Sequence, residues 1–124
     1  MRCIVILGAS LSLLLGAIVG HAGQADVLKV DVRALGGGRY QINTTVKHAD
    51  RGWDHYANAW QVLDHKGQVL GERVLHHPHD NEQPFTRSLT INIPAAVKRI
   101  TVQAKDSVHG YGGKAVTVTL PSPK

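Results

Sequence analysis

Cysteine and methionine are almost absent from this 124-residue chain, which holds one of each, Cys3 and Met1, at its very start. Both stand at or before the beginning of an apolar stretch typical of an export signal, so neither is expected in the exported protein. Without a thiol, that protein forms no disulfide and cannot ligate zinc, iron–sulfur clusters or blue copper through cysteine. Without a thioether it also lacks methionine ligation, so metal binding would depend on imidazole and carboxylate groups.

Charge is also sparse and evenly spread. Lys and Arg number 14 against 9 Asp and Glu, charged residues make up 19% of the chain and hydrophobic residues 43%. No block of one sign occurs, which argues against disorder, a coiled coil and a nucleic-acid-binding tail. The chain also lacks a hydrolase elbow, a phosphate loop, an HExxH pair and a dinucleotide fingerprint. We therefore expect one globular domain that binds no nucleic acid, and assign no catalytic residues.

The first residues have the pattern of a secretory signal peptide. Met1 and Arg2 precede the apolar run 4–19, and small residues follow it. This run is shorter than the roughly 20 residues that a membrane-spanning helix needs, so we expect no stable membrane insertion. Cleavage after Ala22 or after Ala25 fits the small-residue rule, and we favour the second because strand-like alternation begins directly after it. The prediction is a signal peptide at 1–25, a domain at 26–124 without a lipid-attachment cysteine, and a periplasmic or secreted location.

Short runs of alternating apolar and polar residues dominate the rest of the chain. Turn signals rich in Gly, Pro, Asn and Asp separate these runs, and no amphipathic helix pattern lies between them. This arrangement predicts an all-β fold, a seven-stranded antiparallel β-sandwich of the immunoglobulin or fibronectin III-like kind. The expected strands are 28–34, 40–46, 56–62, 68–76, 85–93, 100–104 and 116–120.

Histidines gather in alternate connections of this predicted sandwich. Because each strand runs opposite to the one before it, the second, fourth and sixth connections lie at one end of the domain. These are 48–55, 76–83 and 106–113, and they hold six of the seven histidines of the expected domain. Only His65 lies at the other end.

Imidazole is the commonest transition-metal ligand, so the cluster predicts either a metal site or a polar pocket whose charge depends on pH. His77 and His79 are two residues apart, so in extended backbone their side chains point the same way. With His55 and His109 they form the predicted metal site, for Cu, Zn or Ni. Cleavage after Gly20 would instead expose an amino-terminal histidine that could serve as a copper ligand in an enzyme, but it is the weaker processing site.

A metal-free binding module of the cell envelope is the alternative function. It would recognise an anionic or carbohydrate ligand through Trp53, Asp54, Glu82 and Arg87 at the same end. Arg87 shares the inward parity of its strand, so we expect it to be buried and paired with Glu82 or Asp54. In its other form this module binds a protein, whose identity the sequence does not indicate.

Two segments carry a resemblance to known sequences. They are HPHDNEQPFTRSL at residues 77–89 and DSVHGYGG at residues 106–113. Together with Gly52-Trp53-Asp54-His55-Tyr56 they resemble a group of small exported proteobacterial proteins with no known activity. The resemblance spans most of the expected domain and implies export and a compact β domain.

Overall fold

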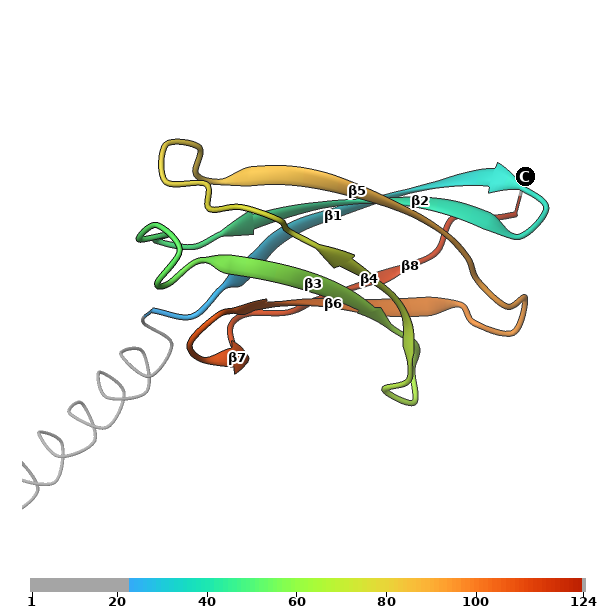
Figure 1. Cartoon of the computed structure of the whole chain (residues 1–124). Helices are drawn as coiled ribbons and strands as arrows, with labels where there is room; N and C mark the ends of the chain where they lie inside the picture. Colours follow the sequence, from blue (N-terminus) through green and yellow to red (C-terminus); the bar gives the residue numbers. More distant parts are fainter. Residues whose placement is uncertain (1–22, 124) are drawn as a thin grey trace, which may run out of the picture.

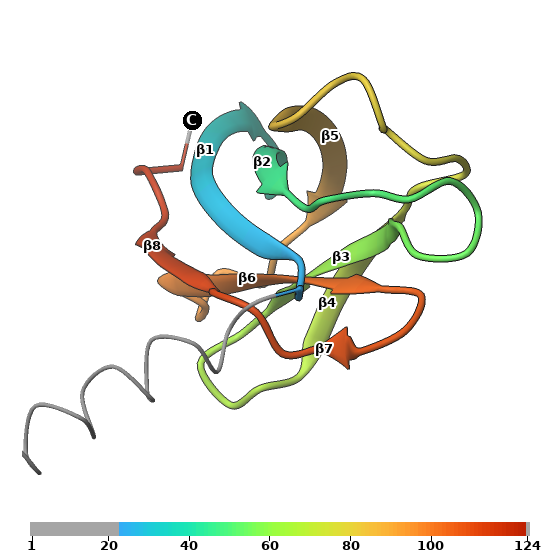
Figure 2. The ribbon, with the colours of Figure 1, turned by 90° about the vertical axis from the view of Figure 1, so that its left-hand side faces the viewer.

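Two antiparallel sheets face each other around one core in the computed structural model, which describes residues 23–123 (Figure 1). One sheet has the order β1-β2-β5, and the other has the order β4-β3-β6-β7, with β8 also paired to β6. Figure 2 shows the sheets as two layers, one above the other. The described strands are β1 (Asp26–Gly36), β2 (Arg39–Lys47), β3 (Ala57–Leu63), β4 (Val69–Val74), β5 (Phe85–Asn92), β6 (Arg99–Asp106), β7 (Gly110–Tyr111) and β8 (Val116–Thr119).

The all-β prediction is confirmed, but the described residues form eight strands rather than seven. The seven predicted strands correspond to β1–β6 and β8, and the additional strand β7 has only two residues, within the sixth predicted connection. The signal peptide predicted at 1–25 lies mostly outside the described residues. Within residues 23–123, no helix is long and apolar enough to cross a membrane.

Alternation along the strands builds the core between the sheets. In β2 every second residue from Tyr40 to Val46 is buried, and β6 shows the same pattern from Ile100 to Ala104. Trp60 of β3 and Phe85 of β5 are the largest fully buried side chains of the described part. Trp60 is thus part of the core and not of a binding surface.

The first strand departs from the predicted alternation at a β-bulge. The pairing of β1 with β2 shifts between Val27 and Lys29, so that Val27 is fully buried whereas Leu28 is 42% exposed. The period-two pattern places Leu28 on the inner face with Val30. That prediction is wrong, because the bulge breaks the alternation and turns Leu28 outward.

The connections β2–β3, β4–β5 and β6–β7 lie at the same end of the domain, as the alternation of strand direction predicts (Figure 1). Gly52 N–H donates to Asp80 and His79 N–H donates to Asp50, which joins the β2–β3 and β4–β5 connections. Tyr56 N–H donates to the Ser107 hydroxyl, which joins the β2–β3 and β6–β7 connections. This end of the domain brings together the side chains described next.

Candidate functional site

Two buried polar residues continue the inward alternation of their strands. His48 directly follows β2 and extends the buried series of Thr44 and Val46, with only 3% of its surface exposed. Asp106 ends β6 after the buried Val102 and Ala104, with 2% exposed. Both side chains therefore point into the end of the core, where an unpaired charge would be costly.

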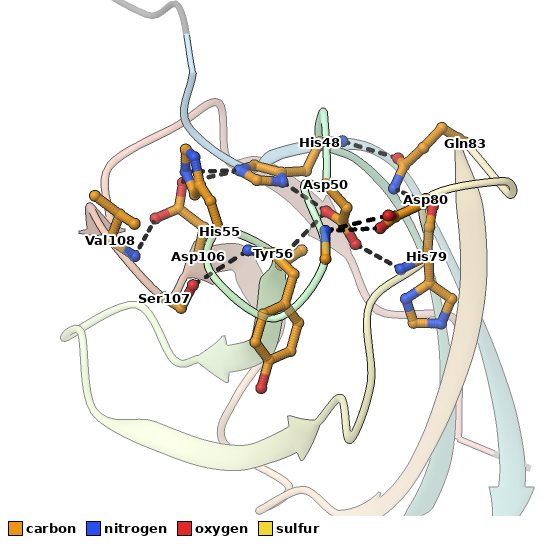
Figure 3. Close-up of polar contacts among 12 residues, drawn as sticks. His48, Asp50, His55, Tyr56, His79, Asp80, Gln83, Asp106, Ser107 and Val108 are labelled. Carbon is orange, nitrogen blue, oxygen red and sulfur yellow. Dashed lines mark hydrogen bonds and ion pairs between the residues drawn. The ribbon is translucent and has the colours of Figure 1, made fainter.

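Three imidazole rings converge on one carboxylate oxygen of Asp106. Oδ2 lies 2.9 Å from Nε2 of His48, 3.0 Å from Nε2 of His55 and 2.9 Å from Nδ1 of His109. The Nε2 atoms of His48 and His55 are 3.3 Å apart. Figure 3 shows His48, His55 and Asp106 meeting where the β2–β3 and β6–β7 connections come together. We call His48, His55, Asp106 and His109 the histidine–aspartate cluster.

The second carboxylate oxygen of Asp106 fixes its own loop. Oδ1 accepts hydrogen bonds from the backbone N–H groups of Val108 and His109. Burial by itself raises the pKa of Asp106, but hydrogen bonds from the backbone and ring of His109, from His55 and from Val108 outweigh it and hold the pKa well below the ordinary value of 3.8. Asp106 is therefore an anion surrounded by imidazoles.

Asp50 orients the buried histidine from the other side. Its Oδ1 accepts a hydrogen bond from Nδ1 of His48 at 2.6 Å and one from the backbone of Ala57. Its Oδ2 accepts the backbone N–H of His79 at 2.7 Å. A carboxylate on one ring nitrogen fixes the tautomer and leaves the other nitrogen free to act as a ligand, the arrangement common behind metal-bound histidines.

The cluster fits a metal ion in its donor atoms and spacing. When Nδ1 of a neutral His48 carries the proton toward Asp50, its Nε2 presents a lone pair to Nε2 of His55 and Oδ2 of Asp106. These electron-rich atoms attract one another only when a proton or a metal cation lies between them. Two metal–nitrogen bonds of about 2.05 Å at a tetrahedral angle separate the nitrogens by about 3.3 Å, which matches His48 and His55. The ligand atoms of His48, His55 and Asp106 all lie within 4.8 Å of one another.

The structure brings together two of the four predicted metal ligands. His55 and His109 are in the cluster, with ring centroids 5.0 Å apart. His77 and His79 form a separate pair, and the His79 ring stacks on Phe85 with a centroid distance of 4.0 Å. Figure 3 shows the His79 ring apart from the side chains of His48, His55 and Asp106. The four predicted histidines therefore do not form a single site in this structure.

The sequence-based reasoning missed His48, Asp50 and Asp106 as members of this site. Two of them carried a signal, since His48 and Asp106 each continue an inward alternation of apolar residues beyond the end of a strand. A polar group in such a position must be paired or ligated. Asp50 lies in the irregular stretch after β2, where no periodicity predicts the direction of a side chain.

Three of the four predicted ligand-binding residues line a depression beside the cluster. Trp53, Glu82 and Arg87 border it, whereas Asp54 is exposed and does not. Arg87 pairs with Glu82 at 3.0 Å, which confirms the predicted ion pair. The predicted burial of Arg87 is wrong, because its side chain is 28% exposed and that of Glu82 is 56% exposed. The arginine side chain is long enough to start on the inward side of the strand and still carry its guanidinium to the edge of the depression.

Comparison with known proteins gives one relative. The chain is 40% identical over 99 residues to a protein of Halomicrobium mukohataei named "Putative lipoprotein". The match covers 80% of this chain and 49% of that protein, so the chain spans about half the length of the curated relative it matches. No family model matches the chain, and no solved structure matches it.

Proposed function

We propose that this protein is an exported envelope protein that binds a divalent transition metal through His48, His55 and Asp106. The observation that carries the proposal is the meeting of two imidazole nitrogens and a buried carboxylate oxygen at ligand spacing. His109, beside the same Asp106 oxygen, is the candidate fourth ligand. Cu(II), Zn(II) and Ni(II) all suit imidazole, and Cu(II) is expected to bind most tightly.

Two features support the placement in the envelope. The relative in Halomicrobium mukohataei bears a lipoprotein name, and the start of this chain has the pattern of a secretory signal peptide. We infer a periplasmic or secreted location and a sandwich of the fibronectin III-like kind, with β1-β2-β5 packed on β4-β3-β6-β8. The metal enters from the solvent side, where the side chains of His55 and His109 are 22% and 36% exposed, whereas His48 and Asp106 form the floor.

Metal titration of the exported protein, purified without a histidine tag, tests the proposal. Calorimetry with Zn(II), Cu(II) and Ni(II) is expected to show one site tighter than about 10 μM, or about 7 kcal/mol. His55→Ala removes a partly exposed ligand with little effect on the core, and we expect it to lower affinity by about 100-fold or more. The matched control is His77→Ala combined with His79→Ala, which should leave the affinity unchanged.

Two results would overturn the proposal. One is binding weaker than about 10 μM for all three ions. The other is an affinity that His55→Ala leaves unchanged, and in that case protons alone hold the cluster together. A loss of binding in the double variant would instead restore the four-histidine site predicted from the sequence. Because ligating imidazoles must be neutral, affinity should also fall as the pH is lowered.

A further inference from the structure

A shallow depression next to the histidine–aspartate cluster is lined by residues that are not among the proposed metal ligands. Its volume is about 470 Å³, within the usual range for small-ligand sites. Two connections and one strand form its walls: the β2–β3 connection gives Gly52 and Trp53, the β4–β5 connection gives residues 77–82, and β5 gives Arg87. The lining combines one large aromatic ring with several hydrogen-bonding groups.

Trp53 provides a flat apolar surface that its surroundings hold in place. Its side chain is 66% exposed, although a free indole of this size is normally buried in a domain. The ring packs edge-on against the ring of Tyr56, with a centroid distance of 5.5 Å. Both carboxylate oxygens of Asp80 accept the N–H of neighbouring Gly52, at 3.2 and 3.1 Å, which ties the tryptophan loop to the opposite wall. The exposed indole is thus part of a braced rim.

The Arg87–Glu82 pair gives the depression matched donors and acceptors. Arg87 donates one N–H to Glu82 Oε1 and another to the backbone carbonyl of Thr86. Three of its five N–H donors are therefore left for a ligand. Glu82 keeps Oε2 as an acceptor, and the hydrogen bond from Arg87 lowers the pKa of Glu82, so this acceptor is charged at neutral pH. A guanidinium and a carboxylate side by side suit a ligand with neighbouring hydroxyl groups, which both donate and accept.

His79 forms the floor and carries unused hydrogen-bonding capacity. Its residue surface is 6% exposed, and neither ring nitrogen has a hydrogen-bond partner within the described residues. Burial, followed by the charge of Arg87, lowers the pKa of His79, so the ring is neutral and offers one donor and one acceptor. A buried polar group without a partner costs free energy, and both ring nitrogens lie beneath the depression, closed off from solvent.

We propose that this depression binds a neutral, hydroxyl-rich carbohydrate, with a sugar ring lying on Trp53 and neighbouring hydroxyls on Arg87 and Glu82. An anionic ligand is disfavoured, since Glu82 already neutralises Arg87 and Asp80 adds a second carboxylate to the lining. A cation is disfavoured by the guanidinium. A purely apolar ligand would leave these polar groups without partners. The site is separate from the histidine–aspartate cluster and does not depend on the proposed metal.

Titration with defined oligosaccharides tests the proposal, in the presence of EDTA so that a failure of metal binding has no influence. The probes are hexasaccharides of glucose with α-1,4, β-1,4 and β-1,3 linkages, a hexasaccharide of N-acetylglucosamine, free glucose and the anionic trigalacturonic acid. Binding is followed by calorimetry and by indole fluorescence, in which Trp60 is shielded by the core and Trp53 reports the depression. Sedimentation with cellulose, chitin and purified peptidoglycan separates a polymer ligand from a free sugar.

We expect at least one neutral oligosaccharide to bind and to shift the indole emission. Trp53→Ala and Glu82→Gln should each weaken that binding by about tenfold or more, equal to about 1.4 kcal/mol. Arg87→Gln should do the same, whereas the matched control Arg33→Gln, at an exposed position of β1, should have no effect. The proposal is overturned if no neutral probe binds at about 10 mM, if only the anionic probe binds, or if binding survives in Trp53→Ala. Thermal unfolding of each variant confirms that it is folded.

Discussion

Replacing Asp106 by asparagine removes one negative charge from the floor of the cluster and almost no volume. The amide oxygen can still accept the backbone N–H groups of Val108 and His109, so the loop keeps its local fold. On the other side, an NH₂ group replaces Oδ2 and faces three ring nitrogens at 2.9, 3.0 and 2.9 Å. The three rings then lose the anion between them, and the two N–H donors of the amide can serve at most two of the three nitrogens.

The loss of Oδ2 sets the size of the effect. The Asp106 side chain is fully buried, and breaking a buried charged network by removing one partner typically costs 3–5 kcal/mol. Because the hydrogen bonds to Oδ1 are kept in Asp106→Asn, we expect the lower end of this range, a destabilisation of about 3 kcal/mol at pH 7. For a domain of this size that corresponds to a fall in melting temperature of about 15 °C.

The assay is urea and thermal unfolding of the metal-free protein in EDTA, followed by the fluorescence of the buried Trp60. The control is Asp80→Asn, an exposed carboxylate whose two oxygens share the N–H of Gly52; this change should shift the melting temperature by only a few degrees. Because the folded-state pKa of Asp106 lies below its unfolded value, its contribution is complete above about pH 4 and declines as the pH falls further. The reasoning is refuted if Asp106→Asn unfolds within about 1 kcal/mol of the unchanged protein at pH 7.

Three further outcomes follow from the structure. Arg87→Met should change the melting temperature by less than about 5 °C, because the pair with Glu82 is partly exposed; a larger fall in a thermal scan would mean that the pair is buried in solution. Gly113→Ala should unfold the domain or prevent its expression in folded form, since a methyl group there collides with the backbone of Ala25, and a cooperative transition at the original temperature would contradict this contact. The exported protein should retain residues 23–25, because Ala25 is fully buried. An intact mass equal to that of a chain starting at Asp26 would contradict this and support cleavage after Ala25.

The sequence predicted the strands and the grouping of loops better than the identity of the site. Strand direction alternates whatever the order of the sheets, so it was sufficient to bring the connections at 48–55, 76–83 and 106–113 together. The direction of a side chain within a loop depends on hydrogen bonds that no periodicity reveals. His77 and His79 share a side of the chain as predicted, with ring centroids 5.0 Å apart. The backbone N–H of His79 donates to Asp50 and its ring stacks on Phe85, so this pair lies apart from the cluster around Asp106.

The carboxylate of Asp50 connects the two proposed sites. Oδ1 of Asp50 holds the ring of His48 in the cluster, and Oδ2 holds the backbone of His79 under the depression. Gln83 adds a second connection, since its Oε1 accepts the N–H of His48 and its Nε2 donates to the carbonyl of His79 (Figure 3). A change in the position of His48 is therefore transmitted through Asp50 and Gln83 to the segment that carries His79. Because the two sites share no ligand-contacting side chain, Asp50 and Gln83 are the route by which one site would influence the other.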